Sequence, residues 1–197
     1  MIVNRFELVS NNKQQIDISE ANTSVSSCSY SGTSISLSSL LSVISKGTTL
    51  VYGRDYELTG QDTAINAGTY TAQIVGIGRC IGTKSISWTI DKKHITSWTL
   101  NASRTKIPPY TSSEVYVAFT ATLSTPANEP LELVNSAFNF IRKGNGGSNV
   151  KSTSNPQRSY YLKAASNPNP KYIFAQFYLN SANYNSTYQT VYFTVSS

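Results

Sequence analysis

Apolar and polar residues alternate over short stretches in the first half of the chain, and turn residues separate these stretches. Because alternation with period two places successive side chains on opposite faces of a strand, the pattern predicts β-strands. Residues 1–20 alternate imperfectly around a polar turn and are expected to form an N-terminal arm or hairpin. The strands predicted next lie near residues 25–30, 35–44 and 49–52. Turns at roughly ten-residue spacing are typical of a β-sandwich or a small barrel.

Residues 53–90 carry the most specific pattern in the chain. Its glycines predict turns or a close backbone approach, since glycine adopts positive φ most easily. Period-two spacing places Tyr70, Ala72 and Ile74 on one face of a strand, with Thr71 and Gln73 toward water. Trp88 and Ile90 share a face in the same way. The segments are Gly53-Arg54-Asp55-Tyr56, Asn66-Ala67-Gly68-Thr69-Tyr70, Gly76-Ile77-Gly78, Gly82-Thr83 and Trp88-Thr89-Ile90.

Together with Tyr30-Ser31-Gly32 and Gly47-Thr48-Thr49-Leu50, these segments resemble the immunoglobulin-like repeats of bacterial surface proteins and phage virion proteins. The likeness covers about residues 25–90, and Cys80 stands where the repeats usually have a tyrosine. It implies an immunoglobulin-like β-sandwich over residues 21–91, in which the matching residues shape the backbone and fill the core.

A weaker copy of the pattern follows at a nearly constant offset of 103 to 105 residues. Ala72-Gln73-Ile74 aligns with Ala175-Gln176-Phe177, and Trp88-Thr89-Ile90 aligns with Phe193-Thr194-Val195. A constant offset of about one domain indicates a tandem duplication. The expected fold is therefore all-β, with two tandem immunoglobulin-like β-sandwich domains at residues 21–91 and, in divergent form, 92–197. Strands of the second domain are predicted near residues 98–100, 115–123, 131–140, 160–162, 172–179 and 190–195.

Composition agrees with an all-β protein. Hydrophobic residues make up 39% of the chain and charged residues only 13%, so there is ample core material but little surface charge.

No apolar run is long enough to insert into a membrane. The N-terminal residues lack the order of a secretory signal, so we expect a chain that either stays where it was made or is a processed piece. Cys28 and Cys80 fall in predicted strands, and the sequence leaves open whether they are bonded.

Charge is unevenly distributed along the chain. Residues 1–91 hold six basic and seven acidic residues, whereas residues 92–197 hold ten basic and three acidic residues. The basic half contains a glycine-rich stretch at 142–151, in which Arg142, Lys143 and Lys151, with nearby Arg158, are candidate contacts for an acidic partner. The alternative is a flexible, solvated hairpin loop. Nucleic acid is not expected as the partner, because Phe138 and Phe140 alternate like core residues.

Residues for catalysis or metal binding are sparse. The single histidine, His94, lies in the expected linker and would have to meet a serine and a carboxylate across the domain boundary to form a triad. Glu129 and Glu132 flank Pro130 and are expected to be solvated. No zinc, calcium or dinucleotide motif is present, so we expect no catalytic, metal-binding or cofactor-binding residues and no cofactor.

Tyrosine is unusually frequent, with 13 residues, many of them in the second half. We expect about half of the second-half tyrosines to be buried and the others to be available for recognition.

The combined expectation is a non-enzymatic virion structural protein of a tailed bacteriophage. Its expected role is that of an auxiliary decoration protein, bound to the major capsid protein or another virion component and exposing its domains on the capsid exterior. The next expectation for its place in the virion is a component of the tail. The alternatives are a fragment of a bacterial cell-surface adhesin and a glycan-binding accessory module.

Overall fold

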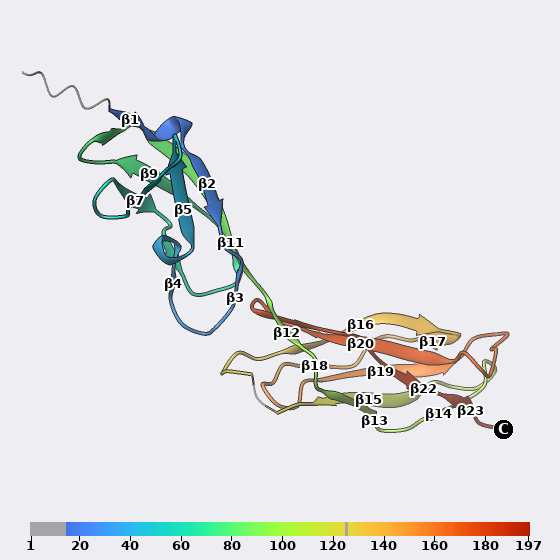
Figure 1. The fold of residues 1–197 in the computed structure, drawn as a ribbon. Coiled ribbons are helices and arrows are strands. Elements are labelled where there is room, and N and C mark those ends of the chain that lie inside the picture. The colour runs from blue at the N-terminus through green and yellow to red at the C-terminus, as the bar shows by residue number, and fades with distance from the viewer. Residues whose placement is uncertain (1–14, 125) are drawn as a thin grey trace, which may run out of the picture. The chain divides into compact units, whose positions relative to one another are not determined.

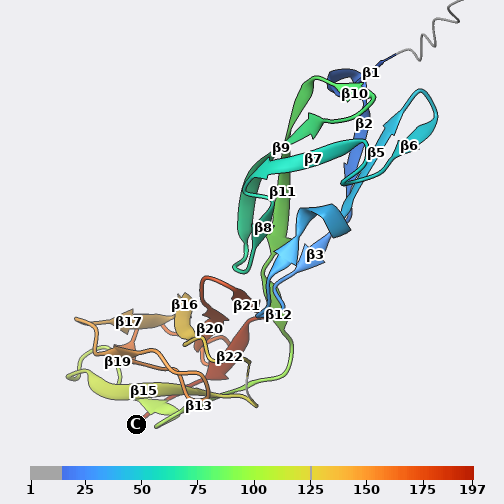
Figure 2. The same ribbon diagram turned by 90° about the vertical axis from the view of Figure 1, so that its left-hand side faces the viewer.

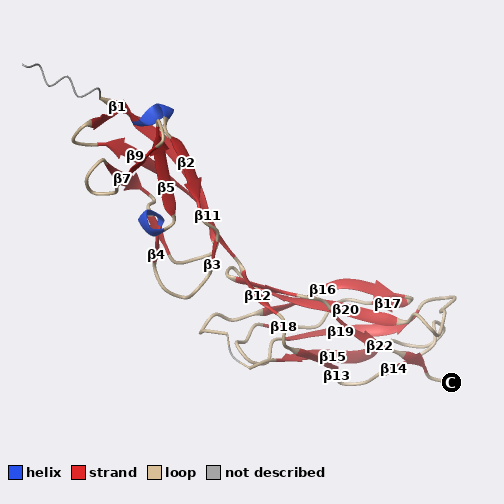
Figure 3. Cartoon of the chain, in the orientation of Figure 1, coloured by secondary structure: helices blue, strands red, loops and turns tan. Residues whose placement is uncertain are grey.

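The computed structural model describes residues 15–124 and 126–197, which form two compact all-β units. Unit 1 comprises residues 15–28, 34–65 and 69–89 of the described chain. Unit 2 comprises residues 90–197 together with the short segments Ser29–Thr33 and Asn66–Gly68. Strands account for the regular structure, apart from two single-turn 3₁₀ helices in unit 1 (Figures 1 and 3).

Unit 1 is built from two small sheets, one with the order β2-β5-β6 and one with the order β3-β11-β9-β7 (Figure 2). Two further pairs, β1-β10 and β4-β8, extend its edges. The elements are β1 (Ile16–Asp17), η1 (Ile18–Glu20), β2 (Asn22–Val25), β3 (Cys28–Ser29), β4 (Ile35–Ser36), η2 (Leu37–Ser39), β5 (Leu41–Ser45), β6 (Thr48–Leu50), β7 (Tyr56–Gly60), β8 (Thr63–Ala64), β9 (Gly68–Gly76), β10 (Cys80–Ile81) and β11 (Thr83–Asp91).

The predicted alternation in β9 and β11 is confirmed. Ala72 and Ile74 are buried while Thr71 and Gln73 are exposed, and Trp88 and Ile90 are both buried. The strand predicted over residues 35–44 was wrong in part, because η2 interrupts it between β4 and β5. No disulfide joins Cys28 and Cys80, which answers the question that the sequence left open.

Most of the expected N-terminal arm, residues 1–14, lies outside the described residues. The remainder belongs to unit 1. Ile16 pairs with Cys80 in a parallel bridge, and Ile18 is fully buried in the core of the unit. The Asp17 carboxylate accepts a hydrogen bond from the Ser19 backbone at 2.9 Å, which begins η1.

The Gly-x-Asp-Tyr segment forms a turn held by a buried carboxylate. Asp55 is 2% exposed and accepts hydrogen bonds from the Val51 backbone at 2.9 Å and from Arg54 at 2.7 Å. Arg79 approaches its other oxygen at 3.4 Å. Gly53 has a φ of 77°, which allows the chain to turn, and Tyr56 enters the core. The motif therefore serves the fold of unit 1.

Unit 2 has two five-stranded sheets, with a short parallel pair β14-β23 beside them. One sheet has the order β13-β15-β19-β17, with β18 also paired to β19, and the other has the order β12-β21-β20-β16, with β22 also paired to β20. The strands are β12 (Lys93–Ile95), β13 (Thr99–Ala102), β14 (Lys106–Ile107), β15 (Val115–Thr122), β16 (Glu132–Asn139), β17 (Ile141–Lys143), β18 (Asn149–Val150), β19 (Gln157–Ala164), β20 (Phe174–Asn180), β21 (Tyr184–Ser186), β22 (Gln189–Tyr192) and β23 (Thr194–Val195).

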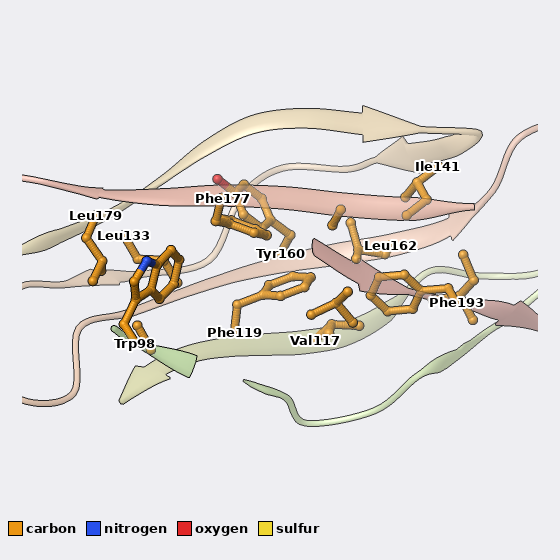
Figure 4. Close-up of a cluster of buried hydrophobic side chains, with 14 of the residues drawn as sticks. Trp98, Val117, Phe119, Leu133, Ile141, Tyr160, Leu162, Phe177, Leu179 and Phe193 are labelled. Atoms are coloured by element: carbon orange, nitrogen blue, oxygen red, sulfur yellow. The ribbon is translucent and has the colours of Figure 1, made fainter. Parts of the chain in front are cut away.

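Aromatic rings fill the space between the two sheets of unit 2. Phe119 from β15 and Phe177 from β20 are fully buried, and their ring centroids lie 4.5 Å apart (Figure 4). Tyr160 from β19 packs edge-on against Phe138 from β16, with a centroid distance of 5.0 Å. Phe119 and Phe177 each lie between two more exposed neighbours, so β15 and β20 present one face to the core and one face outward.

We expect the stability of unit 1 to depend on pH through Asp55. Hydrogen bonds from Arg54 and from the Val51 backbone lower the pKa of this carboxyl from 3.8 to about 2. The stabilisation is therefore complete above pH 3.8 and is lost as the pH falls toward 2.

Amide exchange of β9 and β11 in the intact chain should accelerate over this interval. Asp55→Asn should already show faster amide exchange at neutral pH, and its exchange should accelerate less when the pH is lowered. The control Glu57→Gln, at an exposed position of β7, should match the wild type. An unchanged acid response in Asp55→Asn would contradict the assignment.

Candidate functional site

The glycine-rich stretch lies along the edge of a sheet. β17 and β18 both pair antiparallel with β19, and Arg142 and Lys143 lie in β17. Gly144 and Gly147 donate backbone hydrogen bonds to the carbonyls of Tyr161 and Ser159, each at 2.9 Å. A side chain at Gly147 would collide with Ser159, so this glycine permits the close approach to β19.

Two of the four predicted cations share one carboxylate. Arg158 lies 3.5 Å and Lys151 3.8 Å from the Glu132 carboxylate, which also accepts a hydrogen bond from Asn149. The Glu132 side chain is 30% exposed. The expectation that Glu132 is solvated was therefore wrong, because β16 brings it beside β18 and β19.

Glu129 differs from the expectation as well. Its carboxylate accepts hydrogen bonds from the Asn183 backbone at 3.3 Å and from the Asn183 amide at 2.5 Å. Asn183 is buried. Glu129 is thus bound to the turn that precedes β21 and does not stand free in solvent.

Lys143 and Arg158 approach the same aromatic ring. The Lys143 ammonium lies 5.2 Å and the Arg158 guanidinium 5.6 Å from the centroid of Tyr160. Tyr160 is buried, and this burial raises the pKa of its phenol. Lys143 also stands 6.0 Å from the Phe138 ring. These two cations cover the end of the aromatic core, and such contacts contribute about 0.5–1 kcal/mol at exposed sites.

Arg142 points away from the other three predicted cations. Ile141 is buried while Arg142 is exposed, so the Arg142 side chain leaves β17 on the outer face of the sheet. There it donates a hydrogen bond to the Tyr110 hydroxyl at 3.2 Å and stands 5.4 Å from the Tyr110 ring centroid. The four residues therefore divide into a group of three around Glu132 and Tyr160, and Arg142 on the outer face.

Phe138 and Phe140 have different surroundings, although the sequence placed both in the core. Phe138 packs against Tyr160 and Phe177. Phe140 is 37% exposed and has a φ of 53°. The core expectation was wrong for Phe140, because the chain reverses there between β16 and β17 and turns the side chain outward.

His94 lies in β12, exposed, with its Nδ1 atom 2.8 Å from the Asn185 amide oxygen. Beside it is a cavity of about 200 Å³, whose lining includes Ser97 and Ser124. No carboxylate contributes to this lining among the described residues. The geometry brings the imidazole next to an amide and hydroxyl groups, which suits hydrogen bonding to a small polar group.

The tyrosines of unit 2 are more exposed than expected. Tyr160 and Tyr184 are buried. Most of the others are turned outward, and several form aromatic pairs. Tyr116 pairs with Tyr161 and Phe174 with Tyr192 across neighbouring strands, at centroid distances of 5.7 and 5.9 Å. Tyr178 of β20 pairs with Tyr188, which lies just before β22, at 5.5 Å. Sequence reasoning missed these pairs because it requires the strand register. For the tyrosines that lie in strands, the period-two position beside a buried neighbour was the available signal.

Comparison of the chain with protein-family models, with curated proteins and with solved structures found no match. Over residues 15–124 and 126–197, no helix is long and apolar enough to cross a membrane. The same part of the chain contains no group of three or more His, Cys, Asp or Glu side chains arranged to hold a metal ion.

Arg158 and Lys151, the two cations beside Glu132, should contribute different amounts to the stability of unit 2. We expect Arg158→Met to lower the unfolding free energy of unit 2 by about 1 kcal/mol, because Arg158 contacts both Glu132 and the Tyr160 ring. Lys151→Met should change it by less than about 0.5 kcal/mol, because Lys151 is 60% exposed and only 3.8 Å from Glu132. Urea unfolding of the two variants gives the comparison. Equal effects would argue against the Tyr160 contact.

Proposed function

We propose that this chain is a non-enzymatic structural and binding protein made of two tandem immunoglobulin-like β-sandwich modules. Its role in this proposal is that of an auxiliary protein on the outside of a tailed-phage capsid, bound to the major capsid protein or another virion component. The observation that carries the modular part is the strand order of unit 2, and the virion assignment rests on the sequence resemblance.

The strand order of unit 2 supports the immunoglobulin-like assignment. An immunoglobulin sandwich of constant type has strands A, B, E and D in one sheet and C, F and G in the other. Lettered along the chain as β13, β15, β16, β17, β19, β20 and β22, the strands of unit 2 follow this arrangement, with β13-β15-β19-β17 in one sheet and β16-β20-β22 in the other.

Unit 1 supports the tandem relationship more weakly. Its strand β9 lies between β7 and β11, as β20 lies between β16 and β22. The residues aligned by the repeat occupy equivalent environments, since Ile74 and Phe177 are both fully buried. Trp88 and Phe193 are likewise buried, at 2% and 3% exposure. A common pattern of buried positions in equivalent strands is what two copies of one module retain.

Binding in this proposal is adhesive and multivalent. Each module fills its own interior with the residues of the repeat pattern, which leaves the outer faces available for contact. Many copies on a repeated lattice would make individually modest contacts effectively permanent, because each further contact forms at a high effective concentration.

One observation favours the second candidate, a bacterial surface adhesin or a glycan-binding accessory module. The outer face of the β16-β20-β22 sheet carries two aromatic pairs, Phe174 with Tyr192 and Tyr178 with Tyr188, in each of which the second ring is exposed and the first is half-buried. Between them, Gln176 donates a hydrogen bond to Thr190. Aromatic rings interleaved with amide and hydroxyl groups offer contact area and hydrogen bonds without charge, which suits a neutral sugar.

The capsid assignment is tested by particle association. Purified chain is mixed with particles of the phage whose genome encodes it, depleted of the chain, and the mixture is separated on a density gradient. We expect saturable binding at a fixed copy number, and peptides of the chain in native particles by mass spectrometry. Absence from native particles together with no binding would refute the assignment. Binding to a glycan array under those circumstances would favour the second candidate.

A further inference from the structure

The outer face of the β13-β15-β19-β17 sheet carries a group of cations and tyrosines that lie outside the hydrophobic core. Tyr116, Tyr161 and Lys163 alternate with the buried residues of β15 and β19, so they point away from the core. Arg142 lies on the same face of β17, and Tyr110 approaches it from the loop between β14 and β15. We call these five residues the tyrosine–cation face.

Arg142 and Lys163 are placed directly opposite each other on neighbouring strands. Like charges in this position repel and destabilise a sheet. Both cations lie over the ring of Tyr110, at 5.4 and 5.3 Å from its centroid, and Lys163 also donates a hydrogen bond to the Ser112 carbonyl at 3.4 Å. The tyrosine ring attracts both charges but neutralises neither.

No carboxylate of the described chain forms an ion pair with Arg142 or Lys163. The Glu114 side chain lies against Gly144, which directly follows β17. The Glu114 carboxylate forms no ion pair with Arg142 or Lys163. In contrast, Lys151 and Arg158 are paired with Glu132. Two cations without an ion-pair partner thus remain on the outer face, in the half of the chain that holds ten basic and three acidic residues.

We propose that the tyrosine–cation face is a docking surface for an acidic segment of a protein partner. A partner carboxylate would lie between Arg142 and Lys163, where it relieves their repulsion and can accept paired hydrogen bonds from the guanidinium. The Tyr116–Tyr161 pair, with each ring 45% exposed, supplies the adjoining apolar contact area. This inference rests on the proposed function and names the surface through which unit 2 docks.

The arrangement favours an acidic protein over nucleic acid. A nucleic-acid backbone is neutralised by a row of cations, and its bases stack on aromatic faces. Among the described residues of β17 and β19, two cations on the outer face lack a carboxylate partner, since Lys143 points to the opposite side of β17 toward Tyr160. The rings of Tyr116 and Tyr161 meet edge to face at 68°, which presents no common plane for successive bases.

The test uses the intact chain and a short fluorescein-labelled poly-glutamate peptide, with binding followed by fluorescence anisotropy. The double variant Arg142→Gln/Lys163→Gln removes the two opposed cations. Its matched control, Lys93→Gln/Lys171→Gln, removes the same charge from two exposed lysines of unit 2 outside this face. A labelled oligothymidylate of similar length and a poly-glutamine-containing neutral peptide are run in parallel. Circular dichroism checks the fold, and the single variant Arg142→Gln replaces the double variant if the latter misfolds.

We expect the double variant to bind poly-glutamate roughly tenfold or more weakly than the wild type, and the control variant to stay within about twofold. Wild-type affinity should fall when NaCl is raised from about 0.05 to about 0.5 M, because salt screens exposed charges. Tyr161→Ser should weaken binding without changing the salt dependence. Three results would each overturn the proposal: no poly-glutamate binding, equal losses in both double variants, or oligothymidylate binding as tight as that of poly-glutamate.

The gradient assay separates this inference from the proposed function. If the chain binds particles and the double variant binds them equally well, the docking surface is wrong while the capsid role stands. If the wild type binds poly-glutamate through this face but no particles, the capsid role fails while the acidic-segment surface stands.

Discussion

The contact between Phe119 and Phe177 joins the two sheets of unit 2, and the rest of the unit is arranged around it. Their ring centroids lie 4.5 Å apart, and both side chains are fully buried. Packing at this distance fixes the register of β15 and β20, since a slip by one residue would turn each phenylalanine to the outer face. The orientation of every other side chain in these strands follows from this one constraint.

The chemistry of the outer faces follows from the alternation of inward and outward side chains along each strand. Tyr116 points outward because Val117 points inward, and Lys163 points outward because Leu162 does not. On one sheet this produces a positively charged tyrosine face, and on the other it produces uncharged aromatic pairs. The two sheets of one unit therefore present surfaces of different chemistry, and each suits a different kind of partner.

The positions of several strands could be predicted from the sequence, because the period-two pattern is strong in β9, β11, β15 and β20. In these strands, buried residues alternate with more exposed ones. The Gly-x-Asp-Tyr segment was recognised as a turn, but the burial of Asp55 beneath two arginines was not visible. The grouping of Lys151 with Arg158 around Glu132 depends on contacts between distant strands, which no local pattern encodes. The opposition of Arg142 and Lys163 likewise needs the register of β17 against β19.

Amide hydrogen exchange of the intact chain tests most directly whether each unit closes a core of its own between two sheets. Amides that exchange only through global opening belong to the best-packed strands. We expect the slowest exchange in β15, β19 and β20 of unit 2 and in β5, β9 and β11 of unit 1, with faster exchange in β17 and β18. Protection confined to one unit, or stronger protection in β17 and β18 than in β15 and β20, would contradict the two-core structure.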